Sequence, residues 1–432
     1  MKSINEQPKD SSIYIWNIAG SIANALISVA LLMLVTRALN EQQADIFSIS
    51  WSISQLMATI GTYQIRVYQA TDVQGTFSFR EYLAFRIITI CVMMFCSGVY
   101  VLERGYDGYK AIVVLIVCLF RAVDSLADVY EGWFQQKERL DLAGKALTYR
   151  VVFSSIAFGV VLLFTKELVF SCLILMFGYF VCFLIYDVRY IRTVSIMKIN
   201  EKRRKAKKWF WGLIKEGTPL FINSFIVMSI MNEPKMVIDK AIELGNLTQG
   251  LQTVFNILLM PASFLTLAYI VFRPMITKMA ILWGNGDAKG FLVILAKILG
   301  CLLGLGILLL IGSALLGIQI LSLIYAIDLS KYRIHLLIII VGGCFYTFAA
   351  VLDNSLVVIR KQYVLLIAYV ITYIYIKAVT KQLVMCGGIM GGVISYATAM
   401  GVLLIVTSVM FGVLLKRETK KKREYCSSSK MN

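Results

Sequence analysis

The chain has 432 residues, of which 59% are hydrophobic and only 16% are charged, and its mean hydropathy is +0.77. A soluble globular domain usually carries about a quarter charged residues. The composition therefore excludes an ordinary soluble domain and predicts an integral membrane protein.

Apolar runs recur along the whole chain. A helix needs roughly 20 apolar residues to cross the hydrocarbon core of a bilayer. Six long runs contain no charged residue: 13–36, 46–65, 168–186, 250–272, 298–327 and 382–415. Six shorter runs are bordered by charges: 87–102, 111–120, 151–165, 217–232, 336–352 and 362–376. The sequence thus predicts an all-α polytopic membrane protein with about twelve transmembrane helices. The first run is longer than a signal-peptide core of roughly 7–15 residues, so we expect it to be retained as a helix.

The basic residues indicate the orientation of these helices. If both termini are cytoplasmic, the inside segments hold about three times as many Lys and Arg residues as the outside turns, which agrees with the positive-inside rule. The net charge of +18 could also suit nucleic acid, but no soluble domain is predicted that would present a groove. We expect the basic segments 198–215 and 416–424 to lie against anionic membrane lipids instead.

The basic segment in the middle divides the chain. We expect four parts: an N-terminal six-helix bundle, a cytoplasmic linker, a C-terminal six-helix bundle and a cytoplasmic tail, at 1–190, 191–211, 212–415 and 416–432. Two six-helix repeats around a central cavity are a common plan of transporters.

Signatures of catalysis are absent from the sequence. It contains no phosphate-binding loop, dinucleotide fingerprint or cluster of metal-ligand residues, and its nine cysteines are scattered. The single histidine, His335, has no evident partner. We therefore expect no enzyme activity, no catalytic residue, no cofactor and no metal ion.

Charges in the fourth predicted span form a stripe. Arg121, Asp124, Asp128 and Glu131 are spaced so that they share one face of a helix. Charges inside a membrane are costly and normally face a bundle interior or a wet cavity. Two interpretations are open. The stripe neutralises itself and holds helices together, or it lines a cavity and binds a substrate or an ion.

The seventh predicted span contains Glu233, Pro234 and Lys235, followed by Asp239. Proline removes a backbone donor, so we expect a kink in this helix. Kinked helices bend or form binding sites in many transporters, although a kink near the outer interface could also be without function.

Further charges lie in or beside the predicted spans: Arg66, Arg86, Asp187, Lys297 and Asp353. Arg86 and Lys297 could simply extend to the inner membrane surface. The five cations would nevertheless suit an anionic substrate, since arginine binds phosphate through two parallel hydrogen bonds. They are Arg66, Arg86, Arg121, Lys235 and Lys297.

Several segments carry a resemblance to a known family. They are TRAL at 36–39, YQIRVYQATD at 63–72, NEPKMVIDK at 232–240, FNILLMPAS at 255–263, FRPMITKMA at 272–280 and LSLIYAIDLSKY at 321–332. Together they resemble the polysaccharide-biosynthesis flippases (Wzx type) of the multidrug/oligosaccharidyl-lipid/polysaccharide (MOP) exporter superfamily. One departure is Ala326, which stands where a glycine is common in that family.

The resemblance implies a MATE-like fold of two six-helix bundles that works by alternating access. It also implies that an undecaprenyl-diphosphate-linked oligosaccharide is moved from the inner to the outer leaflet of the bacterial plasma membrane, for capsule, exopolysaccharide or O-antigen assembly. The implied partners are this lipid-linked oligosaccharide, membrane lipids, and a polysaccharide polymerase with other assembly proteins. We expect a monomer that binds no nucleic acid.

The charges and the resemblance together give two sets of candidate site residues. The candidates for substrate binding are Arg66, Arg86, Arg121, Lys235 and Arg273. The candidates for ion binding or energy coupling are Asp124, Asp128, Glu233, Asp239 and Asp353.

Two other functions stay open. A net acidic cavity would favour a cation-coupled multidrug exporter of the same superfamily. A polysaccharide polymerase would typically need a large outer loop, and no predicted loop is long enough.

Overall fold

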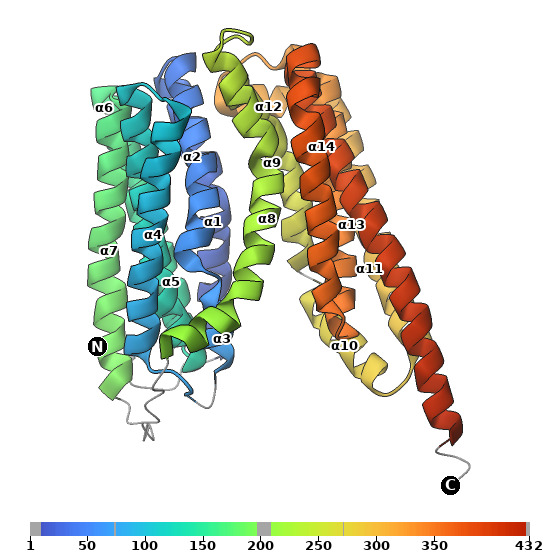
Figure 1. The fold of residues 1–432 in the computed structure, drawn as a ribbon. Helices are drawn as coiled ribbons and strands as arrows, with labels where there is room; N and C mark the ends of the chain where they lie inside the picture. The colour runs from blue at the N-terminus through green and yellow to red at the C-terminus, as the bar shows by residue number, and fades with distance from the viewer. Residues whose placement is uncertain (1–9, 73–74, 197–208, 271, 429–432) are drawn as a thin grey trace. The chain divides into compact units, whose positions relative to one another are not determined.

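A computed structural model describes residues 10–72, 75–196, 209–270 and 272–428 of the chain (Figure 1), and in these ranges every regular element is a helix. The residues form two compact units, Met1–Met228 and Ser229–Asn432. The all-α polytopic architecture expected from the sequence is thereby confirmed.

Unit 1 is built around one central helix. Its helices are α1 (Asp10–Ala38), α2 (Glu41–Thr62), α3 (Ile65–Thr71), α4 (Phe79–Arg104), α5 (Gly108–Gln136), α6 (Leu140–Thr165), α7 (Leu168–Ile196) and the first part of α8 (Trp209–Glu243). Helix α5 packs against α2, α3, α4, α6 and α7, while α1 packs mainly against α6. Because α5 touches so many neighbours, its side chains are positioned to join them.

Unit 2 has α13 at its centre. After the end of α8 come α9 (Leu251–Ile270), α10 (Arg273–Gly284), α11 (Ala288–Gly312), the π-helical turn η2 (Ser313–Gly317), α12 (Ile318–Tyr325), the 3₁₀ turn η3 (Ser330–Tyr332), α13 (Arg333–Val358), the 3₁₀ turn η4 (Gln362–Val364) and α14 (Leu365–Ser428). Helix α13 packs against α9, α10, α11 and α14. Helix α14 is interrupted at Gly388, where φ is 57° and ψ is −135°, so it consists of two helices.

Nine helices of the described residues are long and apolar enough to cross a membrane, and the last of them, Leu365–Thr419, includes the interruption at Gly388. Helices α2 and α5 are of sufficient length, with 22 and 29 residues, but they are not among the nine. Both carry polar side chains that are buried within unit 1, such as Ser50 and Ser54 of α2. The number twelve therefore stays a prediction.

The predicted boundaries of the parts also stay predictions. The two compact units divide between Met228 and Ser229, within α8, and the middle of the predicted linker, 197–208, lies outside the described residues. Helix α8 continues through Pro234 to Glu243. Figure 1 shows a bend in its first part, whose sequence includes Pro219. Ala326 ends α12 with a φ of 55°, which explains why a glycine would suit this position.

Two glycines bring α1 and α6 into close contact. A Cβ atom added to Gly20 would lie 3.0 Å from the carbonyl oxygen of Gly144, and one added to Gly144 would overlap the backbone of Trp16. Small residues let helix backbones approach one another in membranes, where dispersion contacts drive helix packing.

We expect Gly144→Ala to destabilise the protein, because α1 and α6 must separate to admit the methyl group. Overpacking of this kind costs about 1–3 kcal/mol. The measurement is thermal unfolding of the purified protein in detergent. Gly98→Ala in α4 is the matched control, since nothing lies within 4 Å of its added Cβ atom. Equal melting temperatures of the two variants would contradict the close contact.

Candidate functional site

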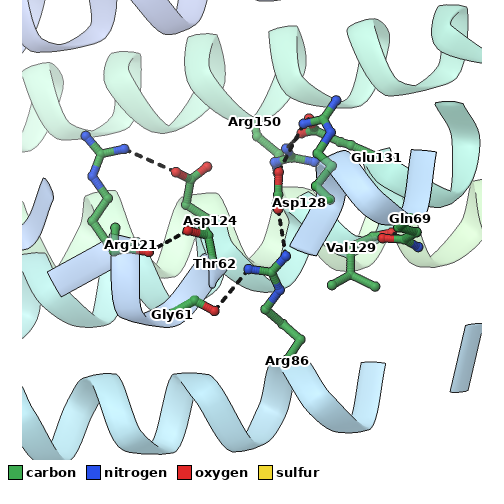
Figure 2. A network of polar contacts seen from close by, with 12 residues as sticks. Gly61, Thr62, Gln69, Arg86, Arg121, Asp124, Asp128, Val129, Glu131 and Arg150 are labelled. Atoms are coloured by element: carbon green, nitrogen blue, oxygen red, sulfur yellow. Dashed lines mark hydrogen bonds and ion pairs between the residues drawn. The ribbon is translucent and has the colours of Figure 1, made fainter. Parts of the chain in front are cut away.

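The charged stripe of α5 faces the interior of unit 1 (Figure 2). Its four residues, Arg121, Asp124, Asp128 and Glu131, all take part in ion pairs. Three of the partners are arginines from other helices: Arg66 of α3, Arg86 of α4 and Arg150 of α6. The spacing of the stripe thus brings two carboxylates of one helix, Asp128 and Glu131, to arginines that are distant in sequence.

Asp128 is shared between two arginines. Its Oδ1 atom accepts a hydrogen bond from Arg66 Nη1 at 3.1 Å, and its Oδ2 atom accepts one from Arg86 Nη2 at 2.8 Å. Arg86 Nη1 also donates to the carbonyl oxygen of Gly61 at 3.0 Å. Arg86 is fully buried, so it does not extend to the membrane surface as one interpretation of the sequence allowed.

Glu131 is shared in the same way. Arg66 Nη1 donates to its Oε2 atom at 2.7 Å, while Arg150 Nη2 donates to its Oε1 atom. Arg150 Nη1 donates in turn to Asp187 of α7. A continuous series of ion pairs therefore runs across α4, α5, α3, α6 and α7. We call the six residues Arg86, Asp128, Arg66, Glu131, Arg150 and Asp187 the charge network.

Arg121 and Asp124 form a second, smaller group. Arg121 Nη1 donates to Asp124 Oδ2 at 3.1 Å, and Tyr179 of α7 donates its hydroxyl to Asp124 Oδ1 at 2.6 Å. The guanidinium of Arg121 lies 4.5 Å from the ring centroid of Trp51, a cation–π contact. These contacts favour the interpretation that this end of the stripe neutralises itself.

The charge network is well suited to hold helices together. Arg86, Arg150 and Asp187 are fully buried, and Glu131 is nearly so. Removing one partner of a buried ion pair leaves an uncompensated charge and typically costs about 3–5 kcal/mol. The sequence analysis assigned no role to Arg150, and it listed Asp187 only among the further charges in or beside the spans. Their signal was weak, because each is a single charge at the border of an apolar run.

Arg66 differs from the other arginines of the network. Its side chain is 31% exposed, and only its Nη1 atom is hydrogen-bonded to the described residues. Both carboxylates that it contacts have a second arginine of their own. Arg66 therefore keeps donor groups available. Its two carboxylate partners would each still have an arginine if Arg66 moved away.

Helix α3 is fixed at a short distance from α5. Gln69 Nε2 donates to the carbonyl oxygen of Val129 at 3.1 Å, and a Cβ atom added to Gly132 would lie 2.5 Å from Gln69 Oε1. At the end of α3, Asp72 accepts hydrogen bonds from the backbone amides of Thr76 and Phe77. Burial raises the pKa of Asp72, but these hydrogen bonds outweigh it and hold the pKa below its usual value.

The remaining candidates lie in unit 2. Glu233 is buried and forms an ion pair with Lys377 of α14 at 2.5 Å. Lys235 is half-buried and has no hydrogen bond or ion pair with the described residues. Asp353 accepts a hydrogen bond from Tyr369 at 2.6 Å, and Asp239 is buried.

Three further expectations can be placed against the structure. Lys297 is exposed, and whether it extends to the membrane surface or serves an anionic substrate stays a prediction. Arg273 is the first residue of α10, but its side chain lies outside the described residues. In the described ranges, no three His, Cys, Asp or Glu residues are grouped as a metal site would require.

Comparisons with known proteins bear on this architecture. No protein-family model matches the chain. It is 23% identical over 344 residues to "Capsular polysaccharide biosynthesis protein CapF" of Staphylococcus aureus. The match covers 79% of this chain and 84% of that protein. Two solved structures match with a TM-score of 0.66. One is an inward-facing multidrug resistance MATE transporter of the MOP superfamily, 12% identical, covering 91% of this chain and 95% of the other. The second is the lipid II flippase MurJ, 14% identical, with 92% and 85% covered.

The chain has the fold of the MOP-superfamily transporters. The resemblance noted in the sequence is thereby confirmed, and so is the expectation of a multi-pass membrane protein. One solved structure is named a transporter and the other a flippase, and the likeness to them shows the fold.

The charge network predicts unequal roles for two of its arginines. We expect Arg150→Met to lower the free energy of unfolding by about 3–5 kcal/mol, because Asp187 loses its only ion pair in the described structure. Arg66→Met should cost much less, since Asp128 and Glu131 keep Arg86 and Arg150. Thermal unfolding in detergent checks both variants. A melting temperature of Arg66→Met as low as that of Arg150→Met would contradict the sharing described here.

Proposed function

We propose that this protein is a flippase that moves an undecaprenyl-diphosphate-linked oligosaccharide from the inner to the outer leaflet of the bacterial plasma membrane by alternating access. The observation that carries the proposal is Arg66, a partly exposed guanidinium with unused donors at the edge of a balanced ion-pair network. The glycan would be a repeat unit of a capsule, an exopolysaccharide or an O-antigen.

The comparisons support this choice of substrate class. One relative in sequence is named for capsular polysaccharide biosynthesis, and one structural neighbour is named a lipid II flippase. Both names involve the assembly of cell-surface glycans or the movement of a lipid across a membrane. A MATE neighbour is named for multidrug resistance, so the fold alone does not select the substrate.

The chemistry of Arg66 fits a diphosphate. A charged headgroup cannot cross hydrocarbon unless polar groups replace its hydration. The guanidinium presents donors in a fixed planar arrangement that matches two phosphate oxygens, and such charge-assisted hydrogen bonds are among the strongest in proteins. Arg86 and Arg150 would act indirectly, because they satisfy Asp128 and Glu131 and leave Arg66 free to engage a second anion.

Lys235 is the second cation that we assign to substrate binding. It has no counter-ion in the described structure, while its neighbour Glu233 is already paired with Lys377. A lysine without a partner in an apolar region is destabilising unless an anion or water reaches it. We assign Asp124, Asp128, Glu233, Asp239 and Asp353 to ion pairing or energy coupling. For Arg273, binding to the substrate stays a prediction from the sequence.

One observation favours a second candidate, export of a cationic small molecule. The side chains of Asp124 and Asp128 are 29% and 21% exposed, so carboxylate as well as guanidinium is accessible in unit 1. Uptake of a fluorescent organic cation into inverted membrane vesicles distinguishes the two functions. We expect no uptake above that of vesicles without the protein.

We expect Arg66→Met to reduce surface polysaccharide roughly ten- to a hundredfold, since charge-assisted hydrogen bonds contribute about 1.5–3 kcal/mol. The measurement is surface polysaccharide in cells whose own copy of the gene is replaced by the variant, normalised to the amount of protein in the membrane. The lipid-linked repeat unit should accumulate in the inner leaflet of the same cells.

The matched control is Lys297→Met, which removes one positive charge from an exposed position of α11. It should leave export unchanged. Normal export by the Arg66→Met variant at normal protein levels would show that the proposed anion-binding role is wrong.

Lys235→Met gives an independent test in unit 2. Because Lys235 has no partner that would be left unpaired, we expect the variant to be as stable as the parent or more stable. Export should nevertheless fall several-fold, because one phosphate contact is lost. A stable variant with full export would show that Lys235 does not bind the substrate.

A further inference from the structure

The connection between α2 and α3 consists of two residues in an unfavourable conformation. Tyr63 has a φ of 45° and Gln64 a φ of 52°, both in the left-handed region. Among the described residues they are the only adjacent pair of non-glycine residues with positive φ. The region disfavours any residue with a Cβ atom, by a factor on the order of five or more per residue. We call Tyr63 and Gln64 the joint.

The joint determines where Arg66 lies. It ends α2 at Thr62 and starts α3 at Ile65, so that the next residue, Arg66, reaches Asp128 and Glu131 of α5. A regular helix continued through 63 and 64 would turn the chain differently and move the guanidinium. The two strained residues are therefore directly coupled to the arginine that keeps free donors.

Two residues in the first part of α8, Thr218 and Phe221, contact Tyr63 of the joint, and we call them the clamp. The ring of Tyr63 stacks on Phe221 with a centroid distance of 4.6 Å and an interplanar angle of 8°. The hydroxyl of Tyr63 is hydrogen-bonded to the hydroxyl of Thr218 at 2.8 Å. Phe85 of α4 contacts the same ring edge-on at 5.4 Å.

Close packing around the clamp shows that it is a fitted contact. A Cβ atom added to Gly217 would lie 2.8 Å from the ring of Tyr63, so only glycine leaves room for the ring. Leu213 of α8 and Ile65 of α3 are fully buried in one hydrophobic cluster with Phe85. Strained residues persist only where surrounding contacts hold them, and here these contacts come mainly from α8.

We propose that Tyr63 and Gln64 are positioning residues that couple the first part of α8 to Arg66. While α8 clamps Tyr63, the strained joint holds Arg66 against Asp128 and Glu131. When α8 moves away, the joint relaxes and Arg66 leaves these carboxylates, which keep Arg86 and Arg150 as partners. The coupling thus gives one arginine two alternative sets of anions. It rests on the proposed function only in taking the second anion to be the substrate's diphosphate.

The test uses Gln64→Gly. Glycine adopts a positive φ without steric cost, so the substitution stabilises the held state, in which α8 contacts Tyr63 and Arg66 lies against Asp128 and Glu131. Spin labels carried by unnatural amino acids replace Val67 of α3 and Trp211 of α8, whose side chains are 55% and 67% exposed. Distances between the labels are measured by pulsed electron paramagnetic resonance in lipid nanodiscs. We expect two distances in the parent, one for each state. In Gln64→Gly the ratio of the held population to the released population should rise on the order of fivefold.

Lys166→Gly is the matched control. Lys166 caps α6 with a φ of 56° and is exposed, so the substitution relieves the same kind of strain away from the joint. Both glycine variants should unfold at a higher temperature than the parent, but Lys166→Gly should leave the ratio of distances unchanged. Thr218→Val removes the hydrogen bond of the clamp and should shift the ratio in the opposite direction.

Three results would overturn the coupling. They are a single distance in the parent, an equal shift in both glycine variants, or a shift in the same direction for Gln64→Gly and Thr218→Val. Cellular export separates this proposal from the proposed function. If Arg66→Met abolishes export while Gln64→Gly leaves the distances unchanged, the coupling is wrong and the flippase stands. If the distances shift as expected while Arg66→Met exports normally, the coupling stands and the proposed anion-binding role of Arg66 is wrong.

Discussion

Unit 1 depends on the sharing of carboxylates between arginines. Asp128 and Glu131 of α5 each contact two arginines, and Arg66 contacts both carboxylates. In a region of low dielectric constant an isolated charge would be very costly, so these groups are stable only as a set. The set also explains why α5 lies at the centre of the unit, because its partners come from α3, α4 and α6.

The same sharing separates structural arginines from a functional one. Arg86 and Arg150 are fully buried and each donates through two guanidinium nitrogens, so the loss of either removes two hydrogen bonds from the interior of unit 1. Arg66 is doubly paired through one nitrogen and partly exposed. A protein that must release and rebind an anion needs a cation that can leave its carboxylate partners without leaving them unpaired. The network supplies this condition for Arg66 and not for Arg86 or Arg150.

The sequence predicted the elements better than the contacts between them. The helical spacing of Arg121, Asp124, Asp128 and Glu131 follows from local geometry, and it correctly indicated an interior face of α5. The pairing of Arg66 with Glu131 joins residues 65 positions apart, and no local pattern reports such a contact. Position left open whether Arg86 extends to the membrane surface or faces the interior, and the carboxylate of Asp128 holds it inside. Likewise, the break at Tyr63 and Gln64 contains no glycine or proline that would have indicated it.

The two units use their charges differently, and this difference bears on mechanism. Unit 1 shares its carboxylates among several arginines, whereas in unit 2 Glu233 has a single cation, Lys377, and Lys235 has no partner in the described structure. Arg66 and Lys235 both keep donors that the protein's own carboxylates do not occupy. A diphosphate carries several acceptor oxygens, and these suit either kind of donor, the planar guanidinium or the compact ammonium. A monovalent cation would leave both unsatisfied, which is the physical reason to prefer an anionic lipid-linked substrate on this fold.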